Sequence, residues 1–358
     1  MGFYDGLGGV STTASAWHTA EVLDLPVLLV VQPKGASLTL AAQINGLKNF
    51  RSPSHLAGIL LNGCSPSLYA LLAPMLERET GVPVLGYLPR LPEGAVESRH
   101  LGLKTAAEIP DLQQKICRLA QALVVDWQKL EHITSRPAPA AVPRQTLPVR
   151  CRIGVAQDEA FCFTYAETLE ALEQQGVQPV FFSPLRDKAL PENIGGLYLP
   201  GGYPELYAGA LSGNLSMRES VRCRVQAGLP TVAECGGFLY LGQSLEDPEG
   251  VCHPMAAVLP GQGFRVGRLV RFGYAGLTAR GDSMLFRTGE TLPVHEFHHW
   301  DSTANGTAFS AAKANGKSWQ CGYANEHLYA GFPHLYWAGT ALPRRFAEAA
   351  QQYQKQEE

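Results

Sequence analysis

Short apolar runs alternate with longer amphipathic stretches along most of the chain, and this alternation predicts strands and helices in turn. The first third contains three candidates for buried strands, at residues 26–31, 56–62 and 83–88, and a helix is expected from Pro66 to Glu79. Strands that alternate with helices are typical of a parallel sheet covered by helices. The pattern therefore predicts an α/β unit in this part of the chain.

The same alternation restarts after residue 150. The strand and helix candidates follow one another at residues 152–156, 164–175, 178–182, 196–199, 217–227 and 231–233. From about Val251 the chain is richer in Gly, Tyr, Phe and Trp, which favours antiparallel strands, and a closing helix is expected from Leu342 to Gln354. We predict a second α/β unit with antiparallel strands appended to it.

Residues 134–150 carry four prolines and show no apolar periodicity. This composition is typical of an extended linker between domains. A chain of 358 residues also exceeds what a single hydrophobic core usually organises. We therefore expect one domain over residues 1–133, a linker over 134–150 and a second domain over 151–358.

Composition and charge narrow the classes of function. Hydrophobic residues make up 46% of the chain and charged residues 17%, as in a soluble globular protein, and the net charge of -3 provides no basic field for nucleic acid or an anionic membrane. The longest apolar run, residues 25–31, is too short to span a bilayer. Eight cysteines without CxxC pairs, and a start without a signal region, predict reduced thiols in the cytoplasm. Small-molecule chemistry is favoured.

Cys235 stands between an apolar strand candidate and two glycines, Gly236 and Gly237, that open a predicted helix. This is the layout of a nucleophile elbow, in which a sharp turn from strand to helix lifts the thiol clear of the sheet. The glycines accept the strained backbone, and the N-terminus of the helix favours thiolate over thiol. A cysteine at such a turn usually attacks a carbonyl carbon, so we predict that Cys235 is a nucleophile.

Further candidates for the same site follow neighbouring strands. Gly201 and Gly202 come directly after the strand candidate at residues 196–199, and ligands of open parallel sheets gather at the carboxyl ends of the strands. Together with the N–H of Gly236, the N–H groups around these glycines could form an oxyanion hole. A thiol nucleophile also needs a base, and His334 offers one, although spacing alone does not select it among the histidines.

A cluster of histidines formally satisfies the H-E-x-x-H signature of zinc proteases, with His295, Glu296 and His299 at the key positions. That signature requires a helix, which places both histidines on one face. Here Pro293 precedes the run, a turn over residues 301–306 follows it, and its aromatic residues favour a strand. In a strand Glu296 faces away from both histidines. We therefore expect no catalytic metal here and predict a structural or substrate-contacting strand.

Six blocks occur in the order seen in cobyrinic acid a,c-diamide synthases, and the resemblance covers essentially the whole chain: residues 1–6, 157–165, 200–207, 233–241, 295–298 and 330–334. Members of this family are glutamine-dependent ATP ligases. In them a P-loop-type synthetase domain phosphorylates the a and c carboxylates of a corrinoid, and a class I glutaminase domain supplies ammonia.

The resemblance implies an α/β fold with a P-loop NTPase-like parallel sheet followed by a flavodoxin-like class I glutamine amidotransferase domain. It implies glutamine, ATP and a corrinoid as substrates and Mg²⁺ as a cofactor. It is compatible with a homodimer or with a separate partner chain. A sister branch that acts on nickel sirohydrochlorin is similar, so the tetrapyrrole that is amidated stays open.

In the glutaminase domain, Cys235 resembles the nucleophile that becomes a glutamyl thioester, and His334 resembles its base. Gly202 and Gly236 are similar to oxyanion donors. Most class I glutaminases place a Glu two residues after the histidine, where this chain has Tyr336. Because the cobyrinic branch commonly lacks that Glu, the resemblance implies a Cys–His dyad.

In the synthetase domain, Asp5 matches the Asp of the family motif E-G-x-M-G-x-Y-D-G, near metal, phosphate and substrate. Asn62 resembles a contact to the nucleotide base, with a turn-forming Asn as the alternative. The chain begins inside this motif, so we expect it to lack the upstream P-loop and the Glu of the motif. The nearest match to a P-loop elsewhere, residues 311–318, lacks the first glycine and is expected to be a surface turn.

Two other readings stay open at this point. The chain could be a stand-alone glutaminase that feeds ammonia to another chain, or a non-catalytic module that binds a corrinoid or a partner. With an incomplete synthetase domain, we expect it to hydrolyse glutamine weakly and to form no diamide by itself. Hydrolysis of glutamine, and the ATP dependence of amide formation, would separate these readings.

Overall fold

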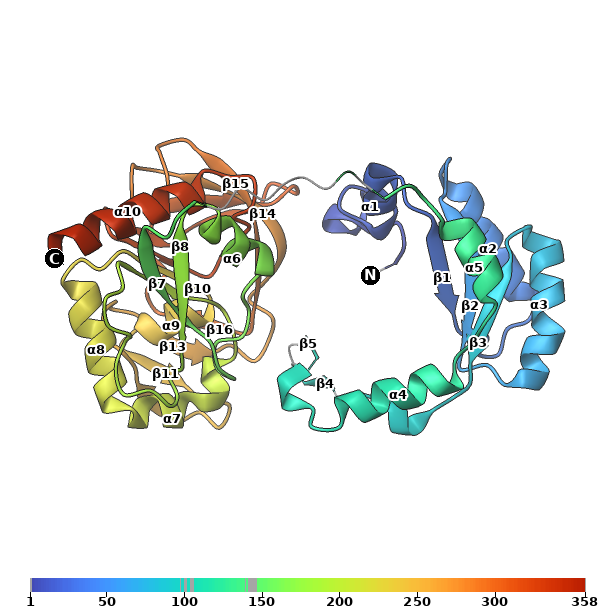
Figure 1. The fold of residues 1–358 in the computed structure, drawn as a ribbon, viewed down its shortest axis with the longest axis horizontal. Helices are drawn as coiled ribbons and strands as arrows, with labels where there is room; N and C mark the ends of the chain where they lie inside the picture. Colours follow the sequence, from blue (N-terminus) through green and yellow to red (C-terminus); the bar gives the residue numbers. More distant parts are fainter. Residues whose placement is uncertain are drawn as a thin grey trace. The chain divides into compact units, whose positions relative to one another are not determined.

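The computed structural model describes residues 2–96, 98–99, 102–103, 106–138, 140 and 147–357 (Figure 1). The chain divides into two compact units, Met1–Ala141 and Val142–Glu358. This division falls inside the segment expected to be a linker, of which residues 139 and 141–146 lie outside the described residues.

The first unit is built on a sheet of four strands in the order β1-β2-β3-β6. Its strands are β1 (Val27–Val31), β2 (Leu56–Asn62), β3 (Val84–Leu88) and β6 (Val124–Val125). The first three are parallel, and β6 runs antiparallel to β3. The three strands expected from the sequence, and their parallel arrangement, are therefore confirmed.

The helices of this unit are α1 (Ala16–Leu23), α2 (Leu38–Phe50), α3 (Pro66–Thr80), α4 (Leu112–Ala122) and α5 (Trp127–Thr134). Its short elements are η1 (Leu7–Gly9), η2 (Pro92–Gly94), η3 (Ala106–Glu108), β4 (Ser98–Arg99) and β5 (Gly102–Leu103). The start of α3 is set by Ser65, whose side chain caps the Leu68 N–H, and by a proline in its first turn. It ends at Gly81 in the left-handed conformation. Residues of α2 and α3 pack on β2 and β3 to form the core of this unit.

The second unit contains a sheet of six strands in the order β19-β20-β10-β9-β7-β8. These are β7 (Cys151–Ala156), β8 (Val177–Phe182), β9 (Gly196–Leu199), β10 (Thr231–Glu234), β19 (Tyr323–Ala324) and β20 (Leu328–Gly331). All neighbours are parallel except the edge strand β19. Four of the parallel strands were expected from the sequence, whereas β20 was not, because it lies in the part predicted to be antiparallel.

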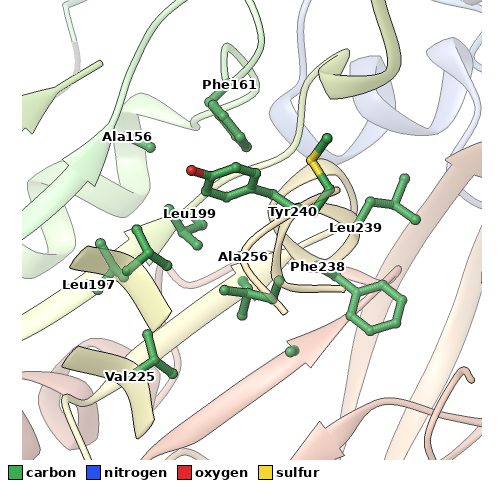
Figure 2. Packing of buried hydrophobic residues seen from close by; sticks show 14 of the residues in the cluster. Ala156, Phe161, Leu197, Leu199, Val225, Phe238, Leu239, Tyr240 and Ala256 are labelled. Carbon is green, nitrogen blue, oxygen red and sulfur yellow. The ribbon is translucent and has the colours of Figure 1, made fainter. Parts of the chain in front are cut away.

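The helices of this unit are η4 (Pro204–Tyr207), α6 (Ala166–Glu173), α7 (Ala208–Gly213), α8 (Leu215–Gln226), α9 (Gly236–Leu241) and α10 (Leu342–Glu357). One hydrophobic cluster joins α8 and α9 to the sheet, and Figure 2 shows its buried side chains. In it the ring of Tyr240 meets the ring of Phe161 edge to face, with centroids 5.4 Å apart. A second cluster joins α10 and the antiparallel strands to the sheet.

The antiparallel part forms two further sheets. One has the order β18-β17-β14-β15-β21, and the other β12-β11-β13-β16. Their strands are β11 (Ser244–Glu246), β12 (Cys252–Pro254), β13 (Gln262–Arg265), β14 (Arg271–Ala279), β15 (Thr291–His298), β16 (Trp300–Ser302), β17 (Phe309–Ala312), β18 (Ser318–Cys321) and β21 (His334–Leu335). Every pairing in these two sheets is antiparallel except that of β11 with β13, which is parallel. The antiparallel prediction is therefore confirmed for most pairings and wrong for this one and for β20, whereas the closing helix and the turn near residues 311–318 are confirmed.

The sheets and helices together establish the fold class expected from the sequence, a mixed α/β chain with parallel sheets. None of the helices in the described ranges has the length and apolarity that crossing a membrane would need.

Candidate active site

The sharpest backbone feature of the second unit lies at Cys235, between the end of β10 and the start of α9. This residue has φ 47° and ψ -98°, a conformation that non-glycine residues rarely adopt. Its N–H donates a hydrogen bond of 2.8 Å to the carbonyl of Gly331, the last residue of β20. The turn expected from the sequence is thus present, and it is anchored to the neighbouring parallel strand.

His334 lies at the same edge of the sheet. It begins β21, three residues after the end of β20, and stands opposite His295 in the pairing of β15 with β21. Its side chain is buried, as is that of Cys235, with residue exposures of 9% and 7%. In the described chain no hydrogen bond joins the Cys235 thiol to the imidazole, a situation common in catalytic pairs before substrate binds. The fold therefore brings the two residues to adjacent strand ends.

The three glycines predicted for this site lie in tightly packed backbone, and one of them, Gly201, lies against His334. A Cβ added to Gly201 would overlap the imidazole of His334, and one added to Gly202 would overlap the carbonyl oxygen of Ala160. A Cβ on Gly236 would lie 3.0 Å from the backbone nitrogen of Gly202. The backbone around Gly202 and the start of α9 are therefore in close contact, and larger residues do not fit there. This contact places the Gly202 and Gly236 N–H groups within one small region.

Burial sets the protonation of the pair. It raises the pKa of the Cys235 thiol far above its usual range, and the carboxylates of Glu205 and Glu296 add to this, while the Gly236 N–H opposes it. The expectation that the helix N-terminus favours thiolate is therefore wrong here, because desolvation has the larger effect. Burial also lowers the pKa of His334 to about 4, with His295 and His298 adding to the effect. A neutral thiol thus stands near a neutral imidazole, which can accept a proton.

A cavity of about 350 Å³ opens beside His334. It is lined by His334, His295, Phe297 and the segment from Cys162 to Tyr165. This volume is in the range of small-molecule pockets, which are mostly apolar with a few polar groups. The cavity gives a small ligand access to the imidazole.

One residue that the sequence analysis did not single out is central to this site. Glu234, the last residue of β10, is fully buried, and its Oε2 lies 4.0 Å from Nδ1 of His334. It accepts hydrogen bonds from the Tyr198 hydroxyl at 3.1 Å and from the Leu335 N–H and the Trp337 indole N–H at 3.3 Å each. A carboxylate that ends an otherwise apolar strand, directly before the proposed nucleophile, was the signal that could have revealed it.

The histidine cluster lies on a strand, as predicted. Along β15 Glu296 and His298 are buried, and His295 and Phe297 alternate with them on the more exposed face, so Glu296 does face away from His295. Nδ1 of His298 donates a hydrogen bond of 2.6 Å to the Trp300 carbonyl oxygen, and its Nε2 lies 3.2 Å from Oε2 of Glu296. Over the ranges that the structure describes, no group of three or more potential ligands is arranged to hold a metal ion.

The two residues predicted for the synthetase site lie in the first unit. Asp5 is exposed in the N-terminal loop, where its Oδ2 accepts a hydrogen bond of 2.8 Å from the Gly2 N–H. Asn62 is half-buried and ends β2. No hydrogen bond between these two side chains is seen in the described ranges. The structure thus places Asn62 at a strand end, as expected, and leaves Asp5 open to solvent.

The whole chain is similar in sequence to several known proteins. The cobyrinate a,c-diamide synthase of Clostridium acetobutylicum is 36% identical over 349 residues, which cover 95% of this chain and 78% of that protein. The protein of the same name from Salmonella typhimurium is 37% identical over 351 residues, covering 94% of this chain and 76% of its own. The chain belongs to the cobyrinate a,c-diamide synthase family. The resemblance seen in its sequence blocks is thereby confirmed.

A family domain also matches most of the second unit. Residues 152–341 match the model of the CobB/CobQ-like glutamine amidotransferase domain. A solved glutamine amidotransferase overlaps 55% of this chain and 98% of its own, with 21% identity and a TM-score of 0.41. Cys235, His334 and the three glycines lie inside the matched range of the family domain, whereas Asp5 and Asn62 lie outside it.

Proposed function

We propose that this chain catalyses the glutamine-dependent, ATP-driven amidation of the a and c carboxylates of cobyrinic acid, with ammonia released from glutamine at Cys235. The observation that carries the proposal is the strained turn at Cys235. It directly follows β10, whose neighbour β20 leads to His334 three residues later, and the Gly202 backbone is in close contact with the start of α9. It lies in a glutamine amidotransferase domain of a chain that belongs to the diamide synthase family.

The neutral forms of both side chains suit a concerted first step. Sγ of Cys235 attacks the side-chain carbonyl carbon of glutamine while the imidazole of His334 accepts the thiol proton. The carbonyl π electrons move to the oxygen, and the N–H groups of Gly202 and Gly236 donate hydrogen bonds to the resulting oxyanion. His334 then returns the proton to the amide nitrogen, the C–N bond breaks and ammonia leaves a glutamyl thioester.

The thioester is released by the same groups in reverse order. The imidazole takes a proton from water as the water oxygen attacks the thioester carbonyl. The second oxyanion forms in the same backbone cradle, and the C–S bond then breaks. Protonation of the sulfur returns the thiol and completes the formation of glutamate. Before glutamine binds, burial raises the pKa of the Cys235 thiol, which keeps the resting sulfur protonated and unreactive toward other electrophiles.

The exposed carboxylate of Asp5 fits a magnesium ion, which proteins usually hold by one or two carboxylates together with substrate phosphates and water. Asp5 would thus hold Mg²⁺, and Asn62 at the end of β2 would contact the nucleotide base. When bound, ATP would supply the phosphoryl group that activates a substrate carboxylate for attack by ammonia, and Mg²⁺ would neutralise the charge of the phosphates.

The test is an amidation assay with cobyrinic acid, ATP, Mg²⁺ and either glutamine or ammonium chloride. It is run on the purified chain with and without an added upstream P-loop segment of the family, because the chain by itself is expected to form no diamide. Cys235→Ser should abolish glutamine-dependent diamide formation and spare the ammonia-dependent reaction, because only the thioester route uses the thiol. Glutamine hydrolysis is measured in parallel, with Cys223→Ser as a control, since that exposed cysteine lies on α8.

Each alternative outcome has a distinct meaning. Normal glutamine turnover by Cys235→Ser would refute the assignment of the nucleophile. Glutamine hydrolysis without amidation of any carboxylate would favour a stand-alone glutaminase. Amidation of nickel sirohydrochlorin in place of cobyrinic acid would assign the sister activity. Absence of both reactions in a folded chain would favour a non-catalytic module.

A further inference from the structure

We propose that Glu234 is a positioning residue for His334, and that it takes the place of the carboxylate that most class I glutaminases carry two residues after the histidine. The proposal rests on the proposed function of Cys235 and His334. It replaces the dyad expected from the sequence with a triad whose third member precedes the nucleophile in the chain.

The contacts of Glu234 aim one oxygen at the imidazole. Oε1 is occupied by the Leu335 N–H and the Trp337 indole N–H, each at 3.3 Å. Oε2 accepts from the Tyr198 hydroxyl at 3.1 Å and lies 4.0 Å from Nδ1 of His334. Since a carboxylate oxygen has two lone pairs, Oε2 can bond to Tyr198 and to His334 at the same time.

All three hydrogen-bond partners of Glu234 are donors, which suits a charged carboxylate rather than a carboxylic acid. One of them is the backbone N–H of the residue directly after His334. The carboxylate therefore holds the backbone of β21 and also faces the imidazole of His334.

A carboxylate at Nδ1 has two consequences for a histidine base. It favours the tautomer that carries its proton on Nδ1, so Nε2 is left with a free lone pair for the thiol proton. It also stabilises the imidazolium that forms when that proton arrives. Tyr336, at the position of the usual glutamate, is 50% exposed and its ring lies 6.0 Å from that of Tyr165. It offers no negative charge to the ring.

The titratable groups around Glu234 have pKa values far from neutral pH, so the ionisation of Glu234 can be followed separately. Burial raises the pKa of Tyr198, Tyr165 and Tyr329, and it raises that of Cys235. The pKa of His334 is lowered to about 4. Burial raises the pKa of Glu234 to about 7, although its three donors oppose the shift. Among these groups Glu234 is thus the one whose charge changes near neutral pH.

The experiment compares Glu234→Gln with Tyr198→Phe in the full chain. Gln keeps the size and an acceptor for the donors but removes the charge, whereas Tyr198→Phe removes one hydrogen bond to Glu234 and leaves its carboxylate facing His334. We measure kcat and KM for glutamine hydrolysis from pH 5.5 to 9, together with the thermal unfolding midpoint of each variant.

We expect Glu234→Gln to lower kcat by at least about 100-fold, with KM changed by less than about twofold, because the carboxylate acts on the base and not on substrate binding. The wild-type kcat should rise as pH passes through about 7, and the variant should lose this rise. Tyr198→Phe should retain both the rise and most of the activity. A kcat for Glu234→Gln within threefold of wild type, or an unchanged pH profile, would overturn the proposal.

A measurement on the wild-type chain covers the case in which Glu234→Gln does not fold. The ¹⁵N chemical shifts of the His334 ring, assigned by comparison with His334→Ala, report its tautomer. We expect the proton on Nδ1 at pH 8, and a proton on Nε2 would contradict the proposal. If Cys235→Ser abolishes glutamine hydrolysis while Glu234→Gln leaves it intact, the role of Glu234 is rejected and the proposed function is retained.

Discussion

The candidate residues of the two units lie in opposite surroundings. In the second unit Cys235 directly follows β10, His334 lies three residues after the end of β20, and both are buried. In the first unit Asn62 ends β2 half-buried, and Asp5 is exposed in a loop. The protein interior therefore decides the protonation of Cys235 and His334, whereas Asp5 and Asn62 remain accessible to solvent. Mutations should separate these two situations.

His334→Ala should have the largest effect, because it removes the base that a protonated, buried thiol requires. Glutamine-dependent activity should fall about as far as in Cys235→Ser, and the double variant should be no worse than either single one, since residues that act as a unit lose activity non-additively. Steady-state glutamine hydrolysis measures this. Additive losses in the double variant would point to a different base, and His327→Ala, an exposed histidine beside β20, is the control.

Gly202→Ala tests the backbone cradle of the buried site. The added Cβ would overlap the carbonyl oxygen of Ala160, so the Gly202 N–H must move away from the oxyanion. Loss of one oxyanion donor typically lowers kcat by about 10²- to 10³-fold, and we expect a loss of this size in glutamine hydrolysis. Gly213→Ala is the matched control, because an added Cβ there meets nothing within 4 Å. Similar kinetics in the two variants would argue against a donor role for Gly202.

The buried charge of Glu234 should also appear in the stability of the fold. Its pKa is about 7 in the folded chain against an ordinary 4.5. The folded state thus holds a proton that the unfolded state releases, so this contribution is complete below pH 4.5 and is lost as pH rises through 7. Relative to Glu234→Gln, the wild type should lose about 3 kcal/mol of unfolding free energy across this window. Urea unfolding at pH 5 and pH 8 measures the difference; equal changes in both proteins would refute it.

Asp5→Asn should have the smallest effect and should act on the other half-reaction. Because Asp5 is exposed and lies in the first unit, glutamine hydrolysis should stay unchanged. ATP-dependent amidation with ammonia should fall about tenfold, as when one carboxylate near a metal is neutralised, and higher Mg²⁺ should recover part of it. Asp24→Asn, with its side chain 82% exposed, is the control. A fall in glutamine hydrolysis by Asp5→Asn would contradict the prediction that Asp5 acts only on the ATP-dependent reaction.

The local pattern of apolar and polar residues was enough to predict most strands and helices of the fold. The strands at residues 56–62 and 196–199 were predicted with their observed bounds, since an apolar run between polar turns depends only on nearby residues. β20 was not predicted as parallel, because the sequence around Leu328 carries no signal for its partner strand. Pairing between distant strands is a property of the folded chain.

The sequence by itself determined the turn at Cys235, because a strand followed by two glycines specifies that backbone locally. It also determined that Glu296 faces away from His295, because strand periodicity follows from the pleat. Only the tertiary structure decided that the thiol is protonated and that Glu234 faces His334. Glu234 and Leu335 are 101 residues apart in the chain and meet through two neighbouring strands. Burial and such long-range contacts arise from the packed fold, so no local pattern encodes them.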